Sequence, residues 1–127
     1  MSNARIISVV DDDESVRLAL GCLLRSLGLE SCSFASAEDF LRSACLRDSD
    51  CVIADIQMPG MSGLELQEVM LAQGLPVPII FITAFPAPRI RERAEAAGAV
   101  AILEKPFDAQ VVLDSLDMAF ERRPPRT

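Results

Sequence analysis

The chain of 127 residues contains no histidine, tryptophan or tyrosine, and its six aromatic side chains are all phenylalanine. Without histidine, the chain itself can supply neither histidine-based catalysis nor a histidine-ligated metal site. Basic residues are also few, with 12 Lys and Arg against 19 Asp and Glu and a formal net charge of −7. Because nucleic-acid-binding domains present a basic face, we expect no direct nucleic-acid binding.

Long apolar runs are absent as well, and none approaches the ~20 residues that a membrane-spanning helix needs. We therefore expect no membrane span. We also expect no signal peptide, because only residues 6–10 separate Arg5 from an acidic cluster. The four cysteines form no C-x-x-C motif; they are Cys22, Cys32, Cys45 and Cys51. Each lies in or beside an apolar pattern, so we expect all four to be reduced, which fits the cytoplasm.

Apolar residues nevertheless make up 50% of the chain, enough for one globular domain with a core. Stretches typical of buried strands alternate with helical periodicities. The predicted strands are residues 6–10, 30–34, 52–54, 79–82 and 101–103. The predicted helices are residues 14–27, 36–44, 63–73, 90–97 and 109–120, with a polar loop at 47–50. This alternation favours an α/β fold with a parallel sheet covered by helices on both faces.

Polar residues stand where the predicted strands end. Asp11 and Asp12 follow the first strand, Asp55 ends the third, Thr83 ends the fourth and Lys105 follows the fifth. In a parallel sheet these carboxyl ends share one edge, and in the flavodoxin-like order 2-1-3-4-5 the first and third strands are neighbours. With that order the three acids converge, flanked by the threonine and the lysine.

Three clustered carboxylates repel one another, so at least one should have a raised pKa unless a cation is bound. Oxygen ligands of this kind suit Mg²⁺ or Mn²⁺. The Thr83 hydroxyl and the Lys105 ammonium are suited to binding phosphate. Taken singly, Thr83 could be a structural residue at the end of a strand, and Lys105 could be a solvated loop residue. Together, the residues predict a site that places a phosphoryl group beside a metal, with a carboxylate as nucleophile.

Four motifs carry a resemblance to a known family: Val10-Asp-Asp12, Asp55 to Gly63, Ile82-Thr-Ala84 and Leu103 to Phe107. With this spacing the chain resembles the receiver domain of two-component response regulators. The residues within these motifs are most similar to those of the FixJ-type subfamily. We therefore predict a (βα)5 doubly wound, five-stranded parallel sheet in the order 2-1-3-4-5. Residues 1–121 would form the receiver domain, and residues 122–127 the start of a linker or C-terminal tail.

The resemblance implies a metal site in which Asp12 binds Mg²⁺ directly and Asp11 binds it directly or through water. Asp55 and the backbone carbonyl of Gln57 would complete the protein ligands, and Mn²⁺ could replace Mg²⁺. It further implies that Asp55 is the phosphoacceptor and that Lys105 pairs with the phosphoryl group.

The resemblance also implies roles around this site. Thr83 would bond the phosphoryl oxygens, and the Lys105–Pro106 bond would be cis. The donor would be the phosphohistidine of a sensor histidine kinase. The domain would be a switch rather than an enzyme, although it would assist its own phosphotransfer and dephosphorylation. Its output would be homodimerisation or control of a C-terminal DNA-binding domain outside this chain, in the cytoplasm.

Two departures from the family pattern stand out. Ile102 occupies the position, three residues before the lysine, where receiver domains commonly carry a rotating Tyr or Phe. Pro86 and Pro88 stand at the start of the fourth predicted helix, which we therefore expect to begin late or to be short.

Two other classes remain open from the sequence. One is a pseudo-receiver that acts as a phosphorylation-independent interaction module. The other is a haloacid-dehalogenase-type phosphatase, because Asp11-x-Asp13-x-Ser15 follows the first predicted strand, although such an enzyme needs a second acidic pair after a later strand.

Overall fold

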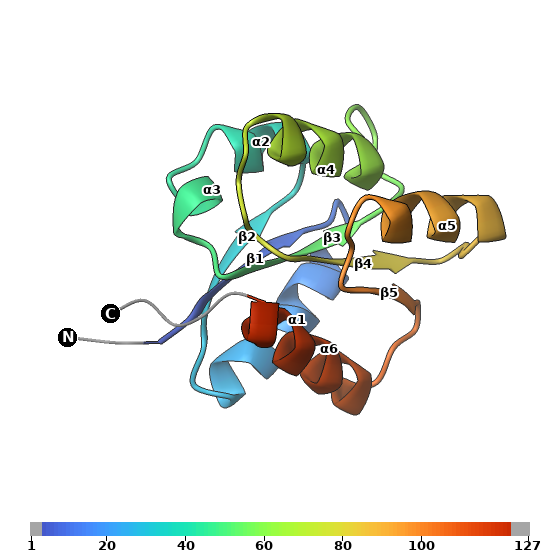
Figure 1. Cartoon of the computed structure of the whole chain (residues 1–127). Coiled ribbons are helices and arrows are strands. Elements are labelled where there is room, and N and C mark those ends of the chain that lie inside the picture. The colour runs from blue at the N-terminus through green and yellow to red at the C-terminus, as the bar shows by residue number, and fades with distance from the viewer. Residues whose placement is uncertain (1–3, 123–127) are drawn as a thin grey trace.

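The computed structural model describes residues 4–122 and consists of a five-stranded parallel sheet between two layers of helices (Figure 1). The strands are β1 (Ile6–Val10), β2 (Glu30–Phe34), β3 (Cys51–Asp55), β4 (Ile79–Thr83) and β5 (Ala101–Glu104). The helices are α1 (Glu14–Ser26), α2 (Ala37–Leu41), α3 (Cys45–Asp48), α4 (Gly63–Ala72), α5 (Pro88–Ala96) and α6 (Ala109–Arg122). The strand order is β2-β1-β3-β4-β5, so the predicted fold class and strand order are confirmed.

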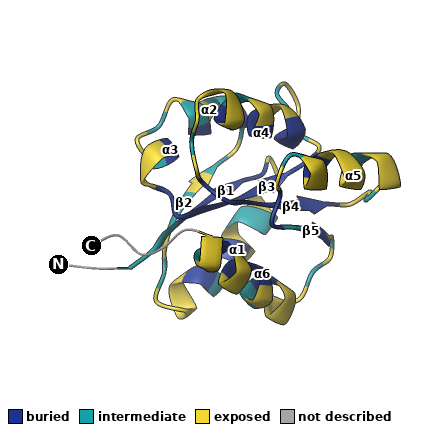
Figure 2. Cartoon of the chain, in the orientation of Figure 1, coloured by how far each residue is buried: buried dark blue, intermediate teal, exposed yellow. Residues whose placement is uncertain are grey.

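Alternate residues of the central strands build two separate cores. Ala54 and Phe81 pack with α2, α3, α4 and α5 on one face of the sheet. Ile53 and Ile80 pack with α1 and α6 on the other face. Since successive strand side chains point to opposite faces, a sheet buried on both sides needs continuous apolar strands. The three central strands, β1, β3 and β4, are accordingly the most buried elements, whereas the edge strand β2 is partly exposed and the helices expose their outer sides (Figure 2).

Local capping signals begin the two helices that flank the acidic edge of the sheet. Asp13 is the N-cap of α1, where its Oδ1 accepts a hydrogen bond from Ser15 N at 2.9 Å. Ser62 and Glu65 form a capping box at the start of α4, with reciprocal bonds of 3.1 and 3.0 Å. Such caps satisfy backbone donors that have no partner inside the helix.

The second predicted helix, residues 36–44, is shorter than expected, because α2 ends at Leu41; a separate short helix that was not predicted, α3, follows at Cys45. Ser43 Oγ donates to the carbonyl oxygen of Phe40 at 2.9 Å, a side-chain bond of the kind that competes with regular helical bonding. The break between α2 and α3 lets α3 turn toward the sheet, where Leu46 joins the core.

The predicted polar loop at residues 47–50 is likewise largely wrong, because its first two residues end α3. Ser49 and Asp50 are buried although both are polar. Ser49 Oγ lies 2.6 Å from Ser8 Oγ, and Asp50 Oδ2 accepts a hydrogen bond from Ile6 N at 2.8 Å. These polar side chains therefore satisfy groups of β1, which a hydropathy pattern does not predict.

The cysteines correct a further expectation. Cys32 of β2 and Cys45 at the start of α3 form a disulfide, so the four cysteines are not all reduced. Cys22 and Cys51 are free, the first exposed and the second buried. The pairing joins two elements that are adjacent only in the folded chain, so cysteine spacing alone gave no sign of it.

The ends of the remaining elements agree with the other expectations in part. Proline is tolerated in a first helical turn, and α5 begins at Pro88, earlier than the predicted residue 90.

Within residues 4–122, no helix is long and apolar enough to cross a membrane. Arg122 is the last residue of α6, and residues 123–127 lie outside the described residues, so the linker stays a prediction.

Candidate functional site

Asp55 is the last residue of β3, at the carboxyl edge of the sheet and between β1 and β4. It is only 5% exposed. Asp11, which directly follows β1, is fully buried, and its backbone N–H continues the strand pairing by donating to Phe34 O at 3.1 Å. The strand order therefore brings two acidic side chains, 44 positions apart in the sequence, to one point of the sheet edge.

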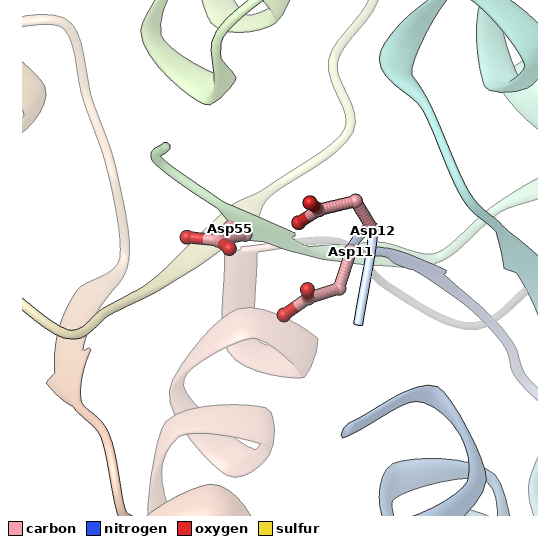
Figure 3. A group of neighbouring side chains, drawn as sticks. All are labelled: Asp11, Asp12 and Asp55. Carbon is pink, nitrogen blue, oxygen red and sulfur yellow. The ribbon is translucent and has the colours of Figure 1, made fainter. Parts of the chain in front are cut away.

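Asp12 completes an acidic cluster with Asp11 and Asp55. Each residue offers one carboxylate oxygen, and the three oxygens lie within 4.8 Å of one another (Figure 3). Asp12 is exposed, so the cluster opens to solvent on one side. Asp11 Oδ2 is buried and accepts no well-aligned hydrogen bond within residues 4–122, although Lys105 lies beside it. Hard oxygen donors, one of them incompletely satisfied, fit a divalent cation with room for water.

Lys105 provides the positive charge of the site. Its Nζ lies 3.0 Å from Asp11 Oδ2 and 3.1 Å from Asp55 Oδ2. Burial lowers the pKa of Lys105, but hydrogen bonds and attraction to the two carboxylates outweigh it and raise the pKa above 10.5. The ammonium is therefore charged at neutral pH. The peptide bond between Lys105 and Pro106 is cis, as the resemblance implied.

The pKa of Asp55 is raised above its ordinary value of 3.8, chiefly because the carboxyl group is buried. Hydrogen bonds from Lys105 and from the backbone of Gln57 lower it, and the charge of Asp11 raises it further. The pKa of Asp55 is thus raised as expected, but burial rather than repulsion between the clustered acids is the main cause. Burial and a neighbouring acid both make this carboxylate less stable as an anion than a solvated aspartate.

Thr83 ends β4 beside the acidic cluster and is fully buried. Its Oγ1 accepts a hydrogen bond from Phe85 N at 3.1 Å, while its carbonyl oxygen accepts one from Lys105 N at 2.8 Å. The threonine and the lysine are therefore connected through the main chain. Phe85 itself is 67% exposed, so an aromatic side chain stands in solvent two residues beyond the buried hydroxyl.

The loop after Asp55 is fitted closely to it. Gln57 N donates to Asp55 Oδ1 at 3.1 Å, which orients the carboxylate. Farther along, a Cβ added to Gly63 would collide with the carbonyl oxygen of Asp55 and with the Cα of Ile56. Only glycine allows α4 to begin so close to the end of β3.

Two residues at the site were not found from the sequence. Arg17 of α1 donates from Nη1 to the carbonyl oxygen of Asp11 at 2.7 Å. Glu38 of α2 accepts a hydrogen bond from Met61 N at 3.2 Å. Arg17 lies in the helix that Asp13 caps, so its proximity could have been inferred, whereas Glu38 and Met61 are brought together only by packing.

Ile102 belongs to the core rather than to the surface. It is 8% exposed and packs in the cluster beneath α4 and α5, which Ile90 also contacts. The position at which receiver domains commonly carry a rotating aromatic is thus filled here by a packed aliphatic side chain.

A parallel sheet in this order, with an acidic cluster, a buried threonine and a lysine at one edge, defines a phosphoacceptor-type α/β switch domain. A profile described as the response regulator receiver domain matches residues 7–117, and the chain belongs to this family. The proposed resemblance is therefore confirmed.

Relatives of known identity agree with this assignment. Nodulation protein W of Bradyrhizobium diazoefficiens is 40% identical over 121 residues, which cover 95% of this chain and 53% of that protein. The solved structure of response regulator StyR is similar with a TM-score of 0.85 and 41% identity, covering 94% of this chain and 61% of that one. The FixJ-N crystal structure is similar with a TM-score of 0.83 and 34% identity, covering 95% and 96%.

The chain spans about half the length of the curated relatives that it matches. The relatives include proteins named as response regulators and transcriptional regulatory proteins, so the pseudo-receiver alternative receives no support from them. The phosphatase alternative is set aside by the family assignment, and Thr83 and Lys105 stand where such an enzyme would need acids.

Proposed function

We propose that Asp55 accepts a phosphoryl group from the phosphohistidine of a sensor histidine kinase and that the domain then switches an output surface. A carboxylate oxygen of Asp55 attacks phosphorus, the P–N bond breaks, and the histidine nitrogen keeps its electron pair. The observation that carries this proposal is the Lys105 ammonium, held 3.0 and 3.1 Å from Asp11 and Asp55 beside an acidic cluster. This arrangement holds a nucleophile, a cation and further oxygen ligands together.

Asp11, Asp12 and Asp55 would hold Mg²⁺, together with the backbone carbonyl of Gln57; Mn²⁺ could serve in its place. The bound ion supplies positive charge that offsets the repulsion between the carboxylates and the incoming phosphoryl group. Asp12 is the exposed member, so it faces the side from which a donor approaches. Gln57 N keeps one oxygen of Asp55 occupied by a hydrogen bond, which fixes the direction of the carboxylate.

Lys105 and Thr83 would bind the phosphoryl oxygens once the group is on Asp55. The lysine would exchange part of its ion pair with Asp55 for the new negative charge. Thr83 now accepts a bond from Phe85 N, and a hydroxyl that accepts one bond still has its O–H to donate. Movement of Thr83 toward the phosphoryl group would pull on the loop that follows β4 and bias a two-state equilibrium, with coupling of about 1–3 kcal/mol.

The wider roles follow from the family. Receiver domains are regulatory, and this one would assist its own phosphorylation and later hydrolysis without being an enzyme that turns over a separate substrate. Its relatives are about twice as long and include transcriptional regulators. We therefore assign the output to homodimerisation, or to a C-terminal DNA-binding domain outside this chain, in the cytoplasm.

The test is intact-mass measurement after incubation with acetyl phosphate, with and without Mg²⁺, on the wild type and on Asp55→Asn. We expect one phosphoryl adduct that needs Mg²⁺ and is absent from the variant. Asp39→Asn, which changes an exposed acid on α2, is the matched control and should be modified like the wild type. A folded wild-type protein that takes up no phosphoryl group would refute the proposal.

A further inference from the structure

Glu38 lies in the first turn of α2 and reaches across to the loop of residues 56–62, which joins β3 to α4. Helices α2 and α4 cover the same face of the sheet (Figure 1). Glu38 Oε2 accepts a hydrogen bond from Met61 N at 3.2 Å. At Gly60, which has φ of +75°, an added Cβ would stand 2.7 Å from the same oxygen. The carboxylate therefore occupies the space that a side chain at position 60 would need.

Glu38 as a whole is half-buried, and only its other carboxylate oxygen is unfavourably placed. Glu38 Oε1 is buried and has no hydrogen-bond partner within residues 4–122. A buried carboxylate oxygen without a partner loses its hydration and gains nothing in return. The adjacent acid on the same helix, Asp39, is exposed and paired with Arg42 at 2.7 Å, so a negative charge near the start of α2 does not require burial. The arrangement at Glu38 calls for a role beyond favouring the helix.

The loop that Glu38 contacts is attached to the acidic cluster at its other end. Gln57 N donates to Asp55 Oδ1 at 3.1 Å, and Gly63 N donates to Ile56 O at 2.9 Å. The capping box of Ser62 fixes the end of the loop nearest α4. The hydrogen bond from Met61 N to Glu38 attaches the loop to α2 as well. It holds the loop at a point between Gln57 and Ser62.

We propose that Glu38 is a positioning residue, which holds the Gly60–Met61 backbone so that the main chain at Gln57 stays in place beside Asp55. Through this loop it sets the affinity of the acidic cluster for Mg²⁺. The inference rests on the proposed metal site, and it adds a residue of α2 that touches neither the ion nor the phosphoryl group.

The test compares Glu38→Ala, Glu38→Gln and Asp39→Ala with the wild type. Titration calorimetry with Mg²⁺ on the unphosphorylated proteins should show about tenfold weaker binding for Glu38→Ala. Glu38→Gln keeps an acceptor of the same reach and should stay within about twofold of the wild type. Asp39→Ala removes the same charge from the same helix without touching the loop and should bind like the wild type.

Amide hydrogen exchange of the metal-free proteins gives a second readout that does not depend on activity. The Met61 amide should exchange faster in Glu38→Ala and remain protected in Glu38→Gln. If Glu38→Ala does not fold by circular dichroism, Glu38→Asp replaces it, because its shorter side chain keeps the charge but cannot reach Met61 without backbone movement.

Wild-type Mg²⁺ affinity in a folded Glu38→Ala or Glu38→Asp protein, with or without faster loop exchange, would overturn this inference and leave the proposed function standing. A wild-type protein that binds no Mg²⁺ would instead remove the proposed metal site, and the inference with it. Equal weakening in Asp39→Ala would show that the effect is one of net charge and would also overturn the inference.

Discussion

Lys105 Nζ donates a hydrogen bond to Asp55 Oδ2 at 3.1 Å, which joins the end of β5 to the end of β3 across 50 positions of sequence. The contact places a charged group beside the carboxylate that would carry the proposed phosphoryl group. In the unphosphorylated chain the lysine therefore stabilises an acid that burial would otherwise disfavour. The free energy of unfolding should therefore change when either Asp55 or Lys105 is replaced.

Asp55→Asn should make the chain more stable at neutral pH. Because burial raises the pKa of Asp55, the folded chain binds this proton more tightly than the unfolded chain does. Stability therefore falls as the pH rises from about 3.8 through the folded-state pKa. Asparagine avoids this loss, so we expect a gain of about 1 kcal/mol at pH 7 that shrinks as the pH falls through the folded-state pKa and is gone below about pH 3.8. Urea unfolding followed by circular dichroism measures it, and a less stable variant at pH 7 would contradict the argument.

Lys105→Met should destabilise the chain at neutral pH by about 2 kcal/mol, because it leaves two buried carboxylates without their cation. The pKa of Lys105 is raised, so its contribution is complete below pH 10.5 and is lost only as the pH rises through the folded-state value. On the acid side the loss should disappear as the carboxylates become protonated. Carbon NMR titration should also find a further increase in the pKa of Asp55. The double variant Lys105→Met, Asp55→Asn tests whether the two side chains interact. If they do, its change in the free energy of unfolding should differ from the sum of the two single changes.

Gly63→Ala should be severely destabilising, because the new methyl group collides with the backbone at Asp55 and Ile56. We expect a loss of at least about 3 kcal/mol in the free energy of unfolding. Gly21→Ala is the matched control, since its methyl group comes close only to the flexible end of Arg25, at 3.2 Å, and lies at ordinary van der Waals distance, 3.9 Å, from Ser31 Oγ. That change should be neutral or stabilising by up to about 1 kcal/mol, in keeping with helix propensity. Similar unfolding curves for the two variants would argue against the close approach of β3 and α4.

The Cys32–Cys45 disulfide should be detectable chemically. In the unfolded, non-reduced protein, only Cys22 and Cys51 should react with an alkylating reagent. Reduction should lower stability by about 3 kcal/mol, the effect of opening a loop of this length. Four reactive thiols in protein purified without reductant would contradict the pairing. Cys32→Ser with Cys45→Ser should then unfold like the reduced wild type.

The sequence was sufficient to predict most of the fold. Apolar runs, capping residues and turn glycines identified the five strands and most of the helices, because each signal is local, and their alternation predicted a parallel sheet. The strand order 2-1-3-4-5 came from the resemblance to receiver domains. The acidic cluster was also predictable, since residues at the carboxyl ends of parallel strands must share an edge. Asp11, Asp55 and Lys105 are brought together as expected.

The errors arise where partners are distant in sequence. Ser49 and Asp50 look like a solvated loop, yet they are buried because β1 offers them hydrogen-bond partners. Cys32 and Cys45 lie in different elements whose separation depends on where α3 packs. Glu38 gave no signal, since its partner Met61 is 23 positions away and lies in the loop before α4, which only packing brings against α2.

The main-chain bond from Lys105 N to Thr83 O has a consequence for protein engineering. The two side chains proposed to bind the phosphoryl oxygens are carried by adjacent strands, whose register pairs Thr83 with Glu104. Transplanting the site into another scaffold therefore requires the β4–β5 register as well as the two residues. A single-residue insertion in β5 would turn every side chain between the insertion and the end of the strand to the opposite face and separate the pair, even if every site residue were retained.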